Sequence, residues 1–372
     1  MGLHIGIVGL PNAGKSTLFN ALTRAGVPAE AYPFCTIEPH VGVVAVPDRR
    51  LEALASVFRP RRVTPATVTF VDIAGLVRGA SRGEGLGNQF LHHIREADAL
   101  VHVVRCFTDA DVGHVEGSVD PVRDAEIVDL ELVLADLESL QRQHERLVKV
   151  ARGGDRTAAL RARVAERLLE ALAAGRPART VPLSEEEERQ AHHFHLLTRK
   201  PVLYLANVDE DDAADPDASP AVRALREYAR SQAAGTDGVA PVLPLCARLE
   251  AELAELEPGE RDEFLQALGL SEPGVHRLVR AALDLLGLIT FFTGNENEVR
   301  AWTVPAGTPA ARAAGVIHTD MERGFVRAEV IPWQDLARAA SFAVAREKGW
   351  VRIEGRDYVM QDGDVMLVRF TP

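Results

Sequence analysis

Short apolar segments alternate with amphipathic stretches through the first two thirds of the chain, which predicts strands separated by helices. The apolar segments cover residues 3–9, 67–71, 99–106, 201–206 and 242–246, and the main helical stretches cover 15–25, 87–97, 220–232 and 249–255. Strands that alternate with helices are typical of a parallel sheet with helices on both faces. We therefore predict an α/β fold with a mostly parallel, doubly wound sheet.

A longer helical pattern interrupts this alternation between the third and fourth predicted strands. In this pattern, residues spaced alternately three and four positions apart would face one side of a helix: Ile127, Leu130, Leu134, Leu137, Gln141, His144 and Val148. Gly153-Gly154 ends this helix, a second helix is predicted over 155–174, and Ser184 is a suitable N-cap for a third helix that reaches 198. We expect an antiparallel helical hairpin inserted into the α/β domain.

From about residue 288 the pattern changes to short strand-like segments separated by turns. These segments cover 299–304, 326–330, 350–353, 358–359 and 365–370, and Asp362-Gly363 predicts a tight turn before the last one. A small mixed β module is expected here. We therefore divide the chain into a first domain built from 1–122 and 199–286, a hairpin insertion over 123–198, and a C-terminal domain over 287–372.

The composition limits which classes of protein this chain can belong to. Hydrophobic residues make up 47% of the chain and charged residues 26%, an ordinary globular balance. Cys35, Cys106 and Cys246 are too far apart for a zinc site or a disulfide framework, which favours a reducing cytosol. We find no signal peptide and no apolar run long enough for a membrane span. A net charge of −12 does not favour nucleic-acid binding, although Arg61 and Arg62 lie in a local basic cluster.

The strongest chemical signal is the segment from Gly9 to Ser16, which has the spacing of a Walker A loop. It follows a predicted strand and precedes a predicted helix, as that motif requires. Its glycines allow backbone N–H groups to surround phosphate oxygens, and the helix N-terminus adds a positive dipole end. Lys15 would contact the β- and γ-phosphates, and Ser16 would bind Mg2+. The residues expected to bind the nucleotide are Asn12, Ala13, Gly14, Lys15, Ser16 and Thr17.

A second motif, Asp72-Ile73-Ala74-Gly75, follows the second predicted strand. A carboxylate at a strand end suits a contact with Mg2+, and the Gly75 N–H suits a contact with the γ-phosphate. Thr36 lies where a switch loop would supply a second hydroxyl ligand. The predicted metal ligands are therefore Ser16, Thr36 and Asp72, and Lys15 and Gly75 are predicted to act on the γ-phosphate during catalysis.

Two positions depart from the pattern of common P-loop hydrolases. Many of these enzymes carry a glutamine after Asp-x-x-Gly that orients the attacking water, and this chain has Leu76 there. An apolar side chain cannot orient water, so either hydrolysis is slow or another group does this work.

The segment from Asn207 to Glu210 stands where GTPases usually have Asn-Lys-x-Asp. The lysine is replaced by Val208 and the aspartate by Glu210, whose extra methylene misplaces it for a bidentate contact with guanine. A site built for the donors of guanine binds weakly when this geometry fails. We expect ATP to be preferred over GTP, with Asn207 and Val208 contacting the base.

These motifs together resemble the YchF-type, Obg-like ATPases. The resemblance rests on Gly-Leu-Pro-Asn-Ala-Gly-Lys-Ser-Thr, on Asp72 to Ser81, on Gly85-Leu-Gly-Asn-Gln-Phe and on Asn207-Val-Asp-Glu. It continues through Glu298-Val-Arg-Ala-Trp-Thr and Asp357-Tyr-Val-Met-Gln-Asp-Gly-Asp, which are similar to that family's TGS module, and it covers essentially the whole chain.

The resemblance implies a G-domain, a coiled-coil hairpin insertion and a β-grasp-like TGS domain. It also implies slow hydrolysis of ATP, Mg2+ as cofactor, and association with the ribosome or its large subunit in the cytoplasm, with RNA contact left open. In this family a histidine after the third strand is linked to the missing glutamine, and the matching residue is His114. His92 and His93 are competing candidates for that role.

Alternatives remain open at this stage. The chain could be a scaffold that binds ATP to order its switch loops without catalysis, or a true GTPase.

Cys35 directly precedes Thr36, so its oxidation would hinder closure of the switch loop, whereas Cys106 and Cys246 are expected to be less accessible. The competing interpretation is that Cys35 is a packing residue. The oligomeric state and any help from a monovalent cation are not predicted.

Overall fold

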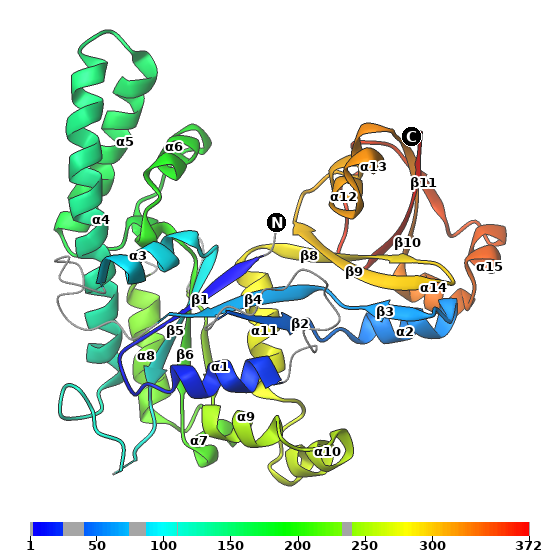
Figure 1. The fold of residues 1–372 in the computed structure, drawn as a ribbon, viewed down its shortest axis with the longest axis horizontal. Coiled ribbons are helices and arrows are strands. Elements are labelled where there is room, and N and C mark those ends of the chain that lie inside the picture. Colours follow the sequence, from blue (N-terminus) through cyan, green and yellow to red (C-terminus); the bar gives the residue numbers. More distant parts are fainter. Residues whose placement is uncertain (1–2, 25–40, 74–86, 110, 233–239, 372) are drawn as a thin grey trace. The chain divides into compact units, whose positions relative to one another are not determined.

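The computed structural model describes residues 3–24, 41–73, 87–109, 111–232 and 240–371. These residues form two compact units (Figure 1). The first unit combines Met1–Val44 with Thr69–Leu278, and the second combines Ala45–Val68 with Val279–Pro372. The sequence analysis placed residues 45–68 in the first domain, whereas here they belong to the C-terminal unit. The domain boundaries proposed from the sequence stay predictions.

The first unit is built on a six-stranded sheet in the order β2-β4-β1-β5-β6-β7. Its strands are β1 (His4–Val8), β2 (Val41–Ala45), β4 (Thr67–Asp72), β5 (Ala99–Arg105), β6 (Val202–Asn207) and β7 (Val242–Leu245). The pairs β1–β4, β1–β5, β5–β6 and β6–β7 are parallel. All residues of β5 and β6 are buried, as expected for central strands of a parallel sheet that is covered on both faces.

Helices connect these strands and pack around the sheet (Figure 1). The helices of this unit are α1 (Lys15–Arg24), α3 (Gly87–Glu96), α4 (Pro121–Ala151), α5 (Arg156–Ala173), α6 (Glu185–Ala191), α7 (Glu210–Ala214), α8 (Pro220–Ser231), α9 (Ala247–Leu253) and α10 (Pro258–Ala267), with short 3-10 turns η3 (Ala178–Thr180), η4 (His192–Phe194) and η5 (Leu197–Arg199). The chain passes from the first unit to the second within α11 (Gly274–Leu285). Helix α1 packs against α9, whereas α4 packs against α8 and β5. In the described part of the chain, no helix is both long and apolar enough to cross a bilayer.

The predicted helical hairpin is present as α4 and α5, which run side by side (Figure 1). The seam differs in part from the predicted one: Leu130 and Leu134 are 49% and 40% exposed, whereas Leu137 packs against the hairpin core as predicted. The buried side of α4 in the hairpin instead includes Val133, Leu140 and the half-buried Leu147. Two apolar stripes with similar spacing run along this helix, and spacing alone did not decide which one faces α5. The third predicted helix ends early, since α6 stops at Ala191.

The second unit holds another six-stranded sheet, in the order β11-β10-β12-β8-β9-β3. Its elements are α2 (Arg49–Phe58), β3 (Arg62–Thr64), β8 (Leu288–Gly294), β9 (Glu298–Pro305), α12 (Ala310–Ile317), α13 (Thr319–Arg323), β10 (Phe325–Pro332), α14 (Trp333–Ala339), α15 (Phe342–Glu347), β11 (Arg352–Glu354) and β12 (Asp364–Phe370). Its core includes Phe291, Ala314 and Met366. The predicted turn is present, because Gly363 has φ 88° directly before β12.

The segment from α2 to β3 is held in the second unit by polar contacts that its sequence did not reveal. Strand β3 pairs with β9 in parallel, and Thr64 donates a hydrogen bond to Glu298. Arg50 bridges Asp48, the N-cap of α2, and Asp362. Arg62, which the sequence placed in a basic surface cluster, is therefore part of a strand.

The choice between the two stripes of α4 can be tested with a matched pair of leucines. Leu140 is 0% exposed and Leu134 is 40% exposed. We expect Leu140→Ala to lower the free energy of unfolding by about 2–5 kcal/mol, because it leaves a cavity between the helices. Leu134→Ala should change it by less than about 1 kcal/mol. Urea unfolding followed by circular dichroism measures both, and equal losses would contradict the observed seam.

Candidate nucleotide-binding site

The chain turns tightly between β1 and α1, and the glycines of this turn are required by its geometry. Gly9 has φ 152° and Gly14 has φ 94°. A Cβ atom at Gly9 would lie 2.4 Å from the carbonyl oxygen of Val103, and one at Gly14 would lie 2.1 Å from Nδ2 of Asn207. Larger residues at either position would push the loop away from β5 and β6. The predicted Walker A segment therefore forms a strand–loop–helix turn, with Ser16 and Thr17 exposed at the start of α1.

The side chain of Lys15 lies beneath this turn. It is 7% exposed, and its Nζ donates a hydrogen bond of 2.8 Å to the carbonyl oxygen of Leu10. Burial lowers the pKa of Lys15 to about 8, although the charge of Asp72 partly opposes this shift. A phosphate bound in the loop would offer this ammonium group a negative charge, which favours its protonated form.

Ser16 and Asp72 meet where α1 begins and β4 ends. The Oγ of Ser16 donates a hydrogen bond of 3.3 Å to Oδ2 of Asp72. Because β4 lies beside β1 in parallel, both strands end at the same edge of the sheet. A hydroxyl and a carboxylate oxygen at this edge are the hard donors that Mg2+ prefers. Two of the three residues that the sequence assigned to the metal, Ser16 and Asp72, are thus brought together, and their oxygen atoms fit that ion.

The buried side chain of Asn207 connects the end of β6 to the turn. Its Nδ2 donates to the carbonyl oxygen of Ala13 at 2.9 Å, and its Oδ1 accepts from the backbone N–H of Ala247, also at 2.9 Å. This amide therefore fixes the end of β6, which the sequence assigned to the base, relative to the P-loop turn.

The sequence prediction for Val208 needs correction. Its side chain is 1% exposed and packs in the hydrophobic core of the first unit. It therefore presents no surface to a base, and we do not retain the expected packing on the ring. Glu210 is exposed in the first turn of α7. Asp209 beside it accepts a hydrogen bond from the backbone N–H of Thr108 at 3.2 Å.

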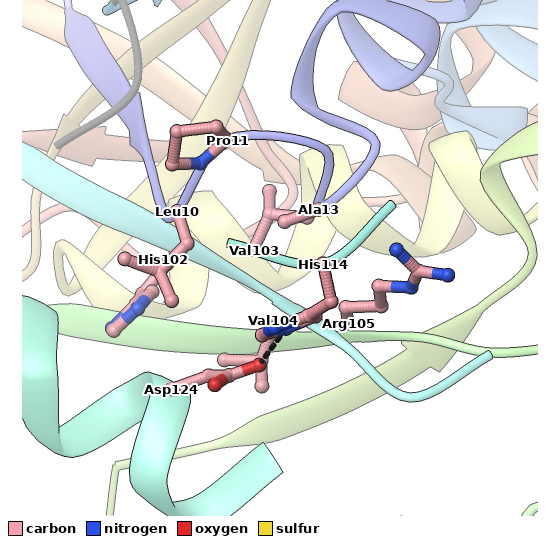
Figure 2. Close-up of a pocket in the computed structure, with 9 residues that line it drawn as sticks. All are labelled: Leu10, Pro11, Ala13, His102, Val103, Val104, Arg105, His114 and Asp124. Atoms are coloured by element: carbon pink, nitrogen blue, oxygen red, sulfur yellow. Dashed lines mark hydrogen bonds and ion pairs between the residues drawn. The ribbon is translucent and has the colours of Figure 1, made fainter. Parts of the chain in front are cut away.

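The loop after β5 brings His114 close to the turn. Arg105 is buried at the end of β5, and its guanidinium donates to the carbonyl oxygens of Asp109 and Val112. Asn12 reaches this loop from the other direction and donates to the carbonyl oxygen of Gly113 at 3.0 Å. His114 consequently lines a small pocket together with Leu10, Pro11 and Ala13 of the turn and with Asp124 of α4 (Figure 2).

The remaining predicted residues are either outside the described part of the chain or exposed on its surface. Thr36, Gly75, Leu76 and Cys35 fall outside the described residues, so their roles stay predictions. His92 and His93 are exposed on α3, where His92 lies 3.6 Å from Glu96.

The two described cysteines, Cys106 and Cys246, are both buried. Burial raises the pKa of the Cys106 thiol to about 12, with a further contribution from Asp124, and it also raises the pKa of Cys246. Both thiols are therefore protonated near neutral pH and hard to oxidise, as the sequence led us to expect.

Comparison with known proteins decides the family. A YchF-GTPase C-terminal family model, with the description "Protein of unknown function (DUF933)", matches residues 288–371, and a model described as "50S ribosome-binding GTPase" matches residues 4–151. The "Ribosome-binding ATPase YchF" of Bacillus subtilis is 49% identical over 370 residues, which is 100% of both chains. The protein of that name from Haemophilus influenzae is 51% identical over 370 residues, covering 100% of this chain and 99% of its own.

The chain belongs to the YchF family. A solved structure, the Schizosaccharomyces pombe YchF GTPase, agrees with this assignment. It is 37% identical, the match covers 99% of this chain and 98% of the other, and the TM-score is 0.88. The resemblance inferred from the motifs is therefore confirmed, and so is the fold of a YchF protein, with a P-loop domain and a C-terminal module.

Some residues of this YchF site were missed on the sequence. Asp124 is the clearest case, because a signal for it existed. Asp124, Val128, Glu131 and Ala135 follow one another at spacings of three and four on the buried stripe of α4. An acidic residue on an otherwise buried stripe calls for a polar partner, and that partner is His114. Arg105 gave no comparable signal, since its partners are backbone carbonyl groups.

The buried ammonium group of Lys15 should make nucleotide binding depend on pH. Its pKa of about 8 in the free protein should rise when phosphates bind, because they favour the charged form. Between about pH 8 and the higher pKa of the complex, binding then takes up a proton, so affinity should fall as pH rises above about 8. Calorimetry in two buffers with different ionisation enthalpies measures the uptake. An affinity that stays constant from about pH 7 to pH 9 would contradict this expectation.

Proposed function

We propose that this chain is a slow, ribosome-associated ATPase that works as a molecular switch. The observation that carries the proposal is the P-loop turn, in which Lys15 lies buried under the loop and Ser16 meets Asp72 at the same edge of the sheet. Relatives that are about half identical over the full chain bear the name ribosome-binding ATPase. That name supplies the partner, and the geometry supports the phosphate chemistry.

Mg2+ is the proposed cofactor. Ser16 and Asp72 would hold it, with Thr36 as a third candidate. When bound, the ion would neutralise part of the negative charge of the phosphates. The chain's own residues do the rest: backbone N–H groups of the turn orient the phosphates, and Lys15 adds a fixed positive charge. Gly75 is proposed to contact the γ-phosphate through its N–H group.

The choice of ATP over GTP rests on the end of β6. The names of the relatives do not agree, since the bacterial proteins are called ATPases and the yeast structure a GTPase. GTPases use an aspartate to accept two hydrogen bonds from guanine, and this chain has the longer Glu210 at that position. Val208 stands in place of the lysine whose stem covers the base in GTPases, and its own side chain is buried. Both losses weaken guanine recognition, while Asn207 remains as the candidate base contact.

His114 is the proposed group that orients the attacking water in place of the missing glutamine. The motivation is its position in a pocket beside the P-loop turn, in a loop that Asn12 contacts directly at the preceding residue, Gly113. His92 and His93 are less suited, because they are exposed on α3.

The ribosome, most simply its large subunit, is the proposed partner, which would place the protein in the cytoplasm. Direct contact with RNA is left to experiment. Two other functions compete with this proposal. A scaffold would bind ATP without hydrolysing it, and a true GTPase would turn over GTP faster. Single-turnover hydrolysis of ATP and GTP, with and without ribosomes, separates all three.

Nucleotide preference is the first test. We expect ATP to bind at least tenfold more tightly than GTP, because a guanine site that loses its aspartate leaves donors of the base unpaired. Titration of the unaltered protein with each nucleotide in the presence of Mg2+, followed by calorimetry, gives both dissociation constants. Equal or tighter binding of GTP would contradict the proposal.

The role of His114 is the second test. We expect His114→Ala to lower kcat for ATP by about tenfold or more while the dissociation constant for ATP changes little, because the imidazole would act on water rather than on the nucleotide. His92→Ala is the matched control, since it removes an exposed histidine from the same domain. If the two variants turn over at the same rate as the unaltered protein, the water is oriented by another residue.

A further inference from the structure

The contact between His114 and Asp124 has the form of an oriented histidine–carboxylate pair. Nε2 of His114 lies 2.7 Å from Oδ2 of Asp124, and both side chains are almost fully buried, at 6% and 4% exposed (Figure 2). A short contact between two buried polar groups is strong and geometrically demanding, because neither group can exchange its partner for water. The carboxylate therefore determines where the imidazole points.

The second ring nitrogen fixes the tautomer. The backbone N–H of Glu116 approaches Nδ1 of His114 at 3.1 Å. A backbone N–H group can only donate, so Nδ1 accepts and the ring proton of the neutral imidazole lies on Nε2, where it is donated to Asp124. Nδ1 is thus the ring atom that carries the acceptor lone pair, and the N–H group that donates to it lies only two residues away in the same loop.

The other oxygen of Asp124 is also committed. Oδ1 accepts from Nε and Nη2 of Arg123, at 3.2 and 2.9 Å. One oxygen thus faces a guanidinium, which can only donate, and the other faces the imidazole. A carboxylate can accept on both sides, whereas an amide of the same size has one acceptor and one donor.

Helix α4 holds this carboxylate in a fixed place. Asp120 caps its first turn by accepting from the backbone N–H of Arg123. Little more than one turn beyond Asp124, Asp129 accepts hydrogen bonds from the hydroxyl groups of Tyr204 and Tyr228, at 2.6 and 2.7 Å. The helix is therefore attached to β6 and α8 close to Asp124, which gives the pair a rigid support.

We propose that Asp124 is a positioning residue for hydrolysis, which holds the imidazole of His114 in the Nε2–H tautomer so that Nδ1 can accept a hydrogen bond from the attacking water. The water would replace the N–H of Glu116 at Nδ1. This inference rests on the proposed role of His114. It requires no proton transfer to the ring, only an orientation of the water, and Asp124 itself contacts neither water nor nucleotide.

Asp124→Asn tests the proposal, because Arg123 determines which way the amide of that variant points. The amide oxygen of that variant has to face the guanidinium, so its NH2 group faces Nε2 and favours the opposite tautomer, with the proton on Nδ1. We expect kcat for ATP to fall by about tenfold, with KM changed less than about twofold. Adding Arg123→Ala frees the amide to rotate and should restore part of kcat. Glu126→Gln, an exposed charge loss on the same helix, is the control and should keep the original kcat.

The tautomer can be read without an activity assay. Long-range 1H–15N spectra of the protein labelled at histidine should show a protonated Nε2 and an unprotonated Nδ1 for His114. This pattern should be altered in Asp124→Asn and retained in Glu126→Gln. The signal is assigned by its absence from His114→Ala.

The outcomes separate this inference from the function on which it rests. Two results together would support the pair acting as a unit: Asp124→Asn is slow, and the double variant with His114→Ala is no slower than His114→Ala alone. If His114→Ala is slow while Asp124→Asn matches or exceeds the original rate, the positioning role is overturned, and a faster rate would mean that Asp124 holds His114 away from the water. Original turnover in His114→Ala would overturn the proposed role of His114 and this inference together.

Discussion

The close approach of the P-loop backbone to its neighbours is the constraint on which the site depends. The turn at Gly9 lies so near the carbonyl of Val103, and the turn at Gly14 so near the amide of Asn207, that neither position has room for a Cβ atom. This proximity places Lys15 in a buried position under the loop. An ammonium group whose pKa is lowered to about 8 by burial is destabilised, by about 3 kcal/mol, until an anion compensates it. The loop is thereby arranged around a phosphate.

Polar side chains connect the P-loop turn to the rest of the domain by hydrogen bonds. Asn207 joins the turn to the start of α9, and Asn12 joins it to the loop that carries His114. Each of these amides bonds to backbone groups, whose geometry varies little with sequence. The P-loop turn, the end of β6 and the loop of His114 are therefore held by one set of hydrogen bonds, so displacement of the turn would strain all three regions.

The sequence predicted the parts of the structure that local rules control. Five strands of the first unit and the P-loop follow from apolar runs and from the spacing of Gly9, Gly14 and Lys15. The sequence did not predict that α2 and β3 join the C-terminal unit, because that depends on pairing between β3 and β9, more than 200 residues apart. The burial of Val208 was missed for a similar reason, since the GTPase pattern specifies a position in the motif and not the packing beneath it.

Helix α4 shows why the site could be located only in part from the sequence. Three of its aspartates are buried, and each contacts a different region: Asp124 contacts His114, Asp129 contacts the tyrosines of β6 and α8, and Asp136 accepts hydrogen bonds from Leu197 and Thr198. Apolar packing would let a long helix slide or rotate at small cost, whereas a buried carboxylate that loses its partner costs several kcal/mol. These three contacts therefore fix both the rotation and the axial position of α4. The helix that begins the hairpin is thus held in register with the loop of His114, and this register depends on partners that no local pattern reveals.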